Sequence, residues 1–143
     1  MNKAKQRIIL PLVLLAAILL LTACDGQGDA YNFVQSSGTV AYAQLVNMTL
    51  EPQKYVGAAV TVRGQCASSY YPVTDLTYYS VVVSDVSVCC SQGIEYLLSG
   101  GDYPADGTEA TVTGEFEVYY ENGIPYCRLK DAEIITNEGD YTT

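Results

Sequence analysis

The chain of 143 residues contains no histidine and no tryptophan. Histidine is the side chain that most often moves protons near neutral pH, so its absence makes ordinary acid–base catalysis harder to build. The sequence also lacks a Gly-x-Ser-x-Gly elbow and a glycine-rich phosphate-binding loop. These absences weigh against an enzyme and favour a binding function.

Basic residues are scarce. Seven Lys and Arg stand against 16 Asp and Glu, which gives a formal net charge of −9. Three of the seven, Lys3, Lys5 and Arg7, precede residue 24, so removal of residues 1–23 would leave four basic residues against the same 16 acidic ones, a net charge of −12. A surface this acidic repels phosphate backbones, and we therefore expect no nucleic-acid partner.

The N-terminal segment has the organisation of a secretory signal. Its basic start is followed by an apolar run from Ile8 to Leu21, which is too short for an ordinary spanning helix. The residues Leu21-Thr22-Ala23-Cys24 then resemble a lipobox, in which a small residue precedes a cysteine that is acylated before cleavage. The resemblance implies a lipoprotein signal peptide over residues 1–23 and a lipid anchor at Cys24, on the extracytoplasmic face of the cell membrane. A plain secretory signal and an uncleaved anchor are the alternatives.

The rest of the chain has room for one domain. Residues 24–38 are mostly Gly, Asp, Asn, Gln and Ser, a composition typical of a flexible tether. Residues 39–136 contain the periodic apolar segments, and residues 137–143 form a polar tail. We therefore expect a folded unit over 39–136, held away from the membrane by the tether.

The first periodic segment, residues 39–48, predicts a short helix. Tyr42, Leu45 and Val46 have the spacing of one helical face. The Glu51-Pro52 step should end the helix, because the residue before a proline disfavours the helical conformation.

After Pro52 the hydrophobic period changes from 3.6 residues to two, which is typical of half-buried strands. In residues 110–120, Val112 and Phe116 face one way while Glu115 and Glu117 face the other, so this carboxylate pair is expected to face solvent rather than form a catalytic dyad. Such patterns predict five strands, at 59–66, 78–83, 93–98, 110–120 and from 126 towards 135, with an Asn122-Gly123 turn before the last.

Five strands with glycine inside the first and fourth predict an all-β fold, a five-stranded OB-fold-like closed barrel preceded by a short helix. A small sandwich is the main structural rival. The glycines in question, Gly64 and Gly114, would lie where a small barrel must bend.

Several segments also resemble the tRNA-anti-like OB domains of uncharacterised bacterial lipoproteins that contain a Cys-Cys motif. The resemblance covers roughly residues 50–135 and implies an OB barrel on a lipid tether, with no established reaction. The segments that carry it are Lys54-Tyr55-Val56-Gly57, Val60-Thr61-Val62-Arg63-Gly64, Val88-Cys89-Cys90-Ser91-Gln92-Gly93-Ile94-Glu95, Thr111-Val112-Thr113-Gly114-Glu115-Phe116 and Cys127-Arg128-Leu129-Lys130-Asp131-Ala132.

Tyrosine is abundant, with 13 residues. Stacking platforms for single-stranded nucleic acid use aromatic rings in a positively charged groove, and here the charge has the wrong sign. We therefore expect cross-strand packing rather than a ligand platform. The tyrosines concerned are Tyr70, Tyr71, Tyr78, Tyr79, Tyr119 and Tyr120.

Four cysteines follow Cys24: Cys66, Cys89, Cys90 and Cys127. An even number outside the cytoplasm favours disulfides, and strand alternation places Cys66 and Cys127 on the inward face. Adjacent residues of a strand point to opposite faces, so Cys89 and Cys90 are not expected to pair with each other, and one of them could bond to Cys66 or Cys127. Sequence leaves the pairing open.

Two further interpretations of these cysteines stay open. Cys89, Cys90 and Cys127 could bind Zn(II) or Cu(I), because soft thiolates suit these ions, although no Cys-x-x-Cys spacing is present. Redox exchange is the second of these interpretations, but the sequence lacks the Cys-x-x-Cys motif at the start of a helix that would lower the pKa of a thiol.

A last candidate is the acidic stretch with Asp102, Asp106 and Glu109, which could hold Ca²⁺ but lacks EF-hand spacing and is better explained as a solvated loop. The sequence as a whole favours a non-enzymatic binding module for an envelope protein or a small ligand, with no required cofactor.

Overall fold

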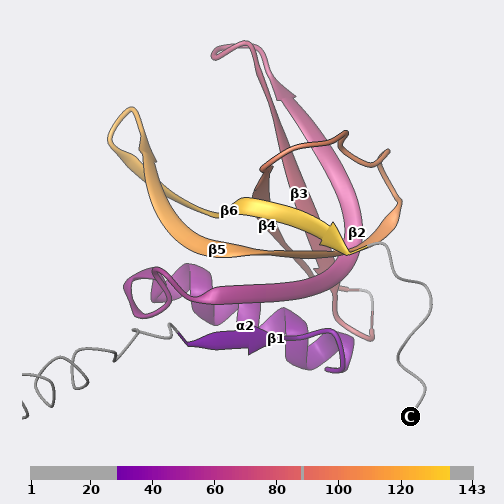
Figure 1. The fold of residues 1–143 in the computed structure, drawn as a ribbon. Coiled ribbons are helices and arrows are strands. Elements are labelled where there is room, and N and C mark those ends of the chain that lie inside the picture. The colour runs from indigo at the N-terminus through magenta and orange to yellow at the C-terminus, as the bar shows by residue number, and fades with distance from the viewer. Residues whose placement is uncertain (1–28, 88, 136–143) are drawn as a thin grey trace, which may run out of the picture.

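The computed structural model of the chain describes residues 29–87 and 89–135 (Figure 1). The predicted signal peptide at 1–23, the lipidation site Cys24 and the polar tail at 137–143 lie outside these residues. The described part is mostly β-structure, with 55% of it in strands. Within it, no helix combines the length and the apolar character needed to cross a membrane.

The elements follow the order expected from the periodicity, with two additions, a short strand at the start and a 3-10 turn after the helix. All five predicted strands are present, and each is longer than predicted. The elements are β1 (Ala30–Asn32), α2 (Gly38–Leu50), the 3-10 turn η1 (Pro52–Lys54), β2 (Ala59–Tyr71), β3 (Leu76–Ser84), β4 (Ser91–Leu98), β5 (Glu109–Glu121) and β6 (Ile124–Ile135).

The six strands form one sheet in the order β1-β2-β3-β4-β6-β5, with an additional pairing between β5 and β2. The strand β2 can pair with both β3 and β5 because its two halves have different partners. Residues 59–65 pair with β5 and residues 65–71 pair with β3. The strands β4 and β6 run parallel, and the remaining pairs among β2 to β6 are antiparallel. The pairings β2-β3-β4-β6-β5-β2 therefore form a ring.

Glycine is required where β2 changes partner. A Cβ atom on Gly64 would lie 2.4 Å from the Val82 carbonyl oxygen of β3, closer than any real contact. A Cβ on Gly114 of β5 would lie 2.9 Å from the Lys130 carbonyl oxygen, at the register shift between β5 and β6. The two strand glycines thus allow neighbouring backbones to approach closely.

The Asn-Gly turn before the last strand is confirmed. Asn122 and Gly123 both have positive φ, at 50° and 81°, the conformation that a tight two-residue hairpin turn needs. This turn sets the register of β5 against β6, in which Glu121 is opposite Ile124.

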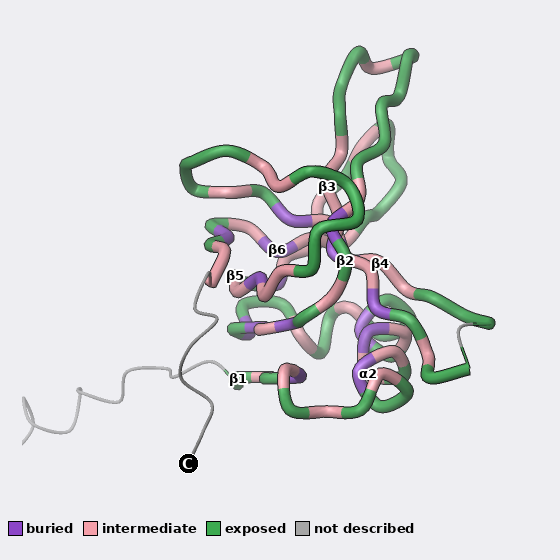
Figure 2. The backbone as a smooth tube through the Cα atoms, turned by 90° about the vertical axis from the view of Figure 1, so that its right-hand side faces the viewer, coloured by how far each residue is buried: buried purple, intermediate pink, exposed green. Residues whose placement is uncertain are grey.

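The core lies on the concave side of the sheet and is closed by α2. Figure 2 shows buried segments where the sheet faces α2 and exposed segments at the ends of the hairpins. The fully buried side chains with the largest volumes are Tyr96, Phe116, Leu45, Met48, Leu129, Val60, Val62, Val81 and Val112.

The helix α2 packs on the sheet through a face slightly different from the predicted one. The Ser37 side chain caps it by accepting a hydrogen bond from the Val40 amide, and Pro52 follows its end. Leu45 is buried as predicted, but Val46 is only partly buried. The buried set is Ala41, Leu45 and Met48, the i, i+4, i+7 spacing of the same helix turned slightly about its axis.

The predicted tether is wrong over its last part. Ala30–Asn32 forms β1, which pairs in parallel with the start of β2, and Phe33 is buried in the core. The tether prediction followed the mostly polar composition of this segment, but two aromatic side chains attach it to the domain. The Tyr31 ring lies 5.3 Å from the Tyr55 ring, centroid to centroid, and Phe33 belongs to the same core cluster as Leu45 of α2.

Candidate functional site

The outward side chains of β3 to β6 form a polar, tyrosine-rich surface between the two long hairpins β2–β3 and β5–β6, which project away from α2 in Figure 1. Alternation dictates this placement, because their neighbours along the strands, such as Tyr96 and Phe116, are buried on the other side. We call this surface the inter-hairpin face. Its residues are Tyr78, Glu95, Glu117, Tyr119, Glu121, Tyr126 and Arg128.

A hydrogen bond links the two hairpins across this face. The Tyr78 hydroxyl on β3 donates towards both Glu121 carboxylate oxygens on β5, at 2.9 and 3.0 Å. The two residues are 43 positions apart in the chain, so the contact fixes the separation of the hairpins rather than the shape of either one.

Arg128 of β6 lies near the centre of the face. Its Nε donates to Glu117 Oε1 at 2.6 Å, across the β5–β6 pair, and its guanidinium carbon lies 4.3 Å from the centre of the Tyr119 ring. Both charged side chains of this pair are about one quarter exposed, at 26% and 24%. The ion pair is therefore partly shielded from water, and the cation contributes to holding the Tyr119 ring in place.

Tyr119 connects this pair to β4. Its hydroxyl donates to Glu95 Oε2 at 2.5 Å, and its ring packs against Tyr126 of β6 with centroids 5.7 Å apart. The cross-strand packing expected for the tyrosines is confirmed for Tyr119, since Tyr119 and Tyr126 are direct partners in the β5–β6 register.

Burial is the main cause of a raised pKa for the Glu95 carboxyl, against which the Tyr119 hydrogen bond and Arg128 act in the opposite direction. Burial and the neighbouring Glu95 carboxylate raise the pKa of Tyr119, so this hydroxyl stays a hydrogen-bond donor throughout the neutral range. The Tyr119–Glu95 contact is thus a neutral donor facing a carboxylate.

The raised pKa of Glu95 predicts a pH dependence of stability. The folded chain holds this proton more tightly than the unfolded chain, so the folded state loses free energy of stabilisation as the pH rises from 4.5 through the raised pKa. Glu95→Gln should remove this component, measured as a flatter dependence of the urea unfolding free energy on pH in that range. Glu133→Gln removes the same charge at an exposed position and should keep the slope. Parallel curves for Glu95→Gln and the parent chain would contradict the assignment.

The inter-hairpin face carries more negative than positive charge. Among its seven residues there are three carboxylates, Glu95, Glu117 and Glu121, and one cation, Arg128. Beside it, Glu115 of β5 faces solvent and pairs with Lys130 at 3.0 Å, as the strand alternation predicted for an ordinary outward residue. A ligand of this face therefore meets acidic groups and tyrosine rings together.

Exposed apolar side chains flank the face at both hairpins. Tyr71 at 51% and Val73 at 79% exposure lie at the end of the β2–β3 hairpin, and Ile124 at 55%, opposite Glu121, lies at the end of the β5–β6 hairpin. Apolar groups that border a polar surface are typical of protein interaction sites.

The four described cysteines form no disulfide with one another. Cys66 and Cys127 face inward as predicted. Cys66 is buried and its sulfur accepts the Tyr96 hydroxyl at 3.6 Å, while Cys127 is half-buried opposite Val118. Burial raises the pKa of the Cys127 thiol. Both are placed as core side chains.

Cys89 and Cys90 do not lie in a strand, and the expectation that they point apart is wrong. They lie in the loop before β4, where both are exposed and their sulfurs approach to 3.4 Å. The opposed-face argument applies to extended backbone only, and the loop removes that constraint. Cys127 is not brought to this pair: within the described ranges, no group of three or more His, Cys, Asp or Glu side chains is arranged to hold a metal ion.

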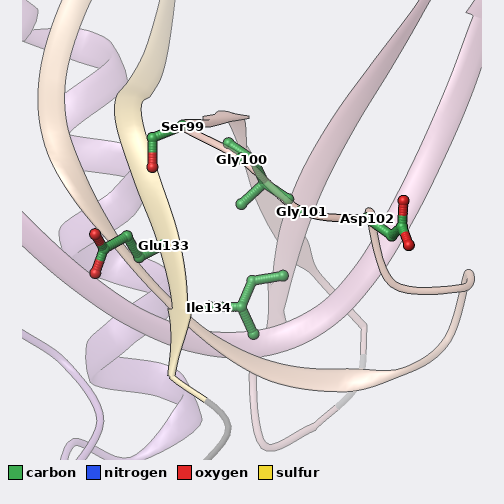
Figure 3. Close-up of a pocket in the computed structure, with 7 residues that line it drawn as sticks. Ser99, Gly100, Gly101, Asp102, Glu133 and Ile134 are labelled. Atoms are coloured by element: carbon green, nitrogen blue, oxygen red, sulfur yellow. The ribbon is translucent and has the colours of Figure 1, made fainter.

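Asp102 and Glu109 of the acidic stretch do not come together to form a cation site either. Asp102 lines a shallow hollow of about 450 Å³ beside β6, and in Figure 3 its carboxylate and that of Glu133 lie on opposite sides, pointing apart. Glu109 lies elsewhere and accepts Arg63 Nε at 2.6 Å. The remaining lining residues are Leu98, Ser99, Gly100, Gly101 and Ile134.

Comparison of the chain with protein-family models, with curated proteins and with solved structures finds no match.

Residue alternation identified the outward strand positions but not the contacts between them. The site residues that sequence reasoning missed are Glu95, Glu121, Tyr126 and Arg128. The one indication in the sequence was that strand alternation places each of them on the same outward side as a tyrosine or a glutamate of a neighbouring strand. Which of these residues come into contact can be known only once the register of the sheet is known.

Proposed function

We propose that this chain is an OB-type binding module, held on the extracytoplasmic face of the cell membrane by lipid at Cys24, which binds a basic segment of an envelope protein. The inter-hairpin face, with its acidic groups, its tyrosines and its apolar borders, is the observation that carries the proposal.

The ring of strand pairings supports the OB assignment. OB folds are small five-stranded Greek-key barrels that bind ligands on the face of their second and third strands and on the loops after strands one and four. Counted from β2, the second and third strands here are β3 and β4, and the two loops are the ends of the β2–β3 and β5–β6 hairpins. The inter-hairpin face thus has the position where OB folds place ligands, an argument from fold-level analogy.

The composition of the face selects the ligand class. Glu95 and Glu121 attract Lys or Arg side chains, and the exposed ring of Tyr126 can accept a cation on its face. Exposed apolar residues at both hairpin ends add area that a peptide backbone and its side chains can bury. Nucleic acid is disfavoured because the chain is strongly acidic.

We propose binding rather than catalysis at this face. Its carboxylates accept hydrogen bonds from Tyr78 and Tyr119 or pair with Arg128. These contacts hold the side chains of the surface in place. Within the described residues of the face, no acid and base are placed so that both could act on the same substrate.

Affinity for a basic probe tests the proposal. The full-length chain in detergent, titrated with a synthetic Lys- and Arg-rich peptide, should bind it with an affinity that falls as salt rises. Glu121→Gln should weaken binding about fivefold, the effect of roughly 1 kcal/mol for losing one charge at the surface of the face. Glu133→Gln, equal in charge change but outside the face, should leave the affinity unchanged. Equal losses in the two variants would mean that overall charge, not this face, binds the peptide.

The membrane anchor has its own test, which does not depend on the binding face. Cys24→Ala should leave an unprocessed precursor without lipid, because the acylated sulfur is required before cleavage in a lipobox. Mass spectrometry should find the diacyl group on the parent chain and none on the variant. A variant that is still cleaved after Ala23 would show that the segment is a plain secretory signal.

A further inference from the structure

The loop between β3 and β4 carries two thiols that are already close. Cys89 and Cys90 are both exposed, with their sulfurs 3.4 Å apart. The loop lies at the α2 end of the molecule, away from the inter-hairpin face (Figure 1). An inference about it is therefore independent of the proposed binding function.

Asp85 organises this loop. Its backbone amide donates to the Cys90 carbonyl at 2.9 Å and so closes the turn. Its carboxylate accepts the Ser87 amide at 3.2 Å and the Ser87 hydroxyl at 2.6 Å, and it also accepts the Thr39 hydroxyl of α2 at 2.9 Å. Because the turn is fixed from both sides, the two sulfurs are held on the same side of the loop.

Ser87 also contacts the first of these thiols. Its hydroxyl oxygen lies 3.0 Å from the Cys89 sulfur, and Asp85 Oδ2 lies 3.9 Å from the same sulfur. With the Ser87 proton donated to Asp85, the Cys89 thiol can donate to Ser87. The chain of contacts Cys89–Ser87–Asp85 orients the thiol towards the turn and leaves the Cys90 sulfur beside it.

We infer that Cys89 and Cys90 are an oxidative modification site that forms a reversible vicinal disulfide. The sulfurs must approach from 3.4 Å to the bonded separation of about 2 Å, a shift that an exposed loop permits. A small-molecule disulfide serves as the oxidant. One cysteine sulfur attacks it, forms a mixed disulfide and releases one thiol; the second sulfur then displaces the other thiol. One S–S bond forms in the loop, the S–S bond of the oxidant breaks, and the two cysteine protons end on the two released thiols.

The other cysteines and a metal ion are weaker partners for this pair. Cys66 is buried against Tyr96 and Cys127 lies on β6, so each would have to leave the core to reach the loop. A two-thiolate pair also leaves a tetrahedral ion short of ligands, and the described part of the chain supplies no cluster of three or more ligating side chains around it.

Peptide mapping tests the inference. Cleavage before aspartate releases a fragment of residues 85–101, which contains Cys89 and Cys90 but neither Cys66 nor Cys127. The full-length chain, treated with oxidised glutathione and then alkylated, should give this fragment two hydrogens lighter and without alkyl groups. After treatment with a reductant before alkylation, the same fragment should carry two alkyl groups.

Matched variants separate the possible outcomes. The Cys66→Ser, Cys127→Ser double variant should still give the lighter fragment, whereas Cys90→Ser should instead carry glutathione or an alkyl group on Cys89. A cross-link from this fragment to one that contains Cys66 or Cys127, or to a second chain, would overturn the inference. So would two alkyl groups after oxidation, or a protection from alkylation that a chelator removes and a reductant does not, since the latter would indicate a bound metal.

Discussion

Gly64→Ala is expected to destabilise the domain by about 3 kcal/mol, the upper end for forced overpacking. The added Cβ would lie 2.4 Å from the Val82 carbonyl oxygen and 3.1 Å from a Val81 methyl carbon. The obstacle is backbone, which cannot rotate away as a flexible side chain can. Relief would require β2 and β3 to separate where β2 passes from its pairing with β5 to its pairing with β3.

Gly93→Ala is the control for this change. Gly93 also lies inside a strand, but its added Cβ would meet side-chain atoms, the nearest a Val82 methyl carbon at 3.5 Å, which is ordinary contact. Urea unfolding should therefore place Gly93→Ala within about 1 kcal/mol of the parent chain. Equal effects of the two substitutions would mean that β2 does not approach β3 closely at Gly64, and the ring of pairings would lose its main support.

Leu45→Ala is expected to cost about 2 to 5 kcal/mol, the range for removing a buried leucine. Leu45 is 1% exposed on α2 and belongs to the same core cluster as Met48 and Phe116. The loss should appear as a lower urea midpoint, since the helix covers the core and its truncation leaves a cavity there.

Leu50→Ala makes the same chemical change on the same helix. Leu50 is 73% exposed, so its truncation should change the unfolding free energy by less than about 0.5 kcal/mol. If both leucine variants matched the parent chain, α2 would not be docked on the sheet. If both lost several kcal/mol, the exposed face of α2 would have a partner that the described structure does not include.

Strong periodicity made the strands predictable. In β5, Val112 and Phe116 are buried while Glu115 and Glu117 are outward, as alternation required, and Asn122-Gly123 fixed the following hairpin. Short elements carry too few residues for a period to appear. For this reason β1, three residues long, was hidden in a polar segment, although Phe33 after it is part of the core.

The candidate site was only partly predictable, for a different reason. Alternation gives the parity of Tyr119 and Arg128 but not their register across strands, and the contacts to Glu95 and Glu117 depend on that register. Contacts between distant hairpins, such as Tyr78 with Glu121, depend on the whole sheet. The adjacent thiols of Cys89 and Cys90 depend on a turn set by the Asp85 side chain, which no periodic pattern reports.

The central claim is that the inter-hairpin face binds a basic protein segment, and amide chemical-shift mapping tests it most directly. A Lys- and Arg-rich peptide, added to the isotope-labelled full-length chain in detergent, should shift the amides around Tyr78, Glu95, Glu121 and Arg128 in a saturable, salt-sensitive manner. An acidic peptide of the same length and a single-stranded oligonucleotide should leave them in place. Saturable shifts confined to α2 and the β3–β4 loop, or stronger binding of the oligonucleotide, would contradict the account.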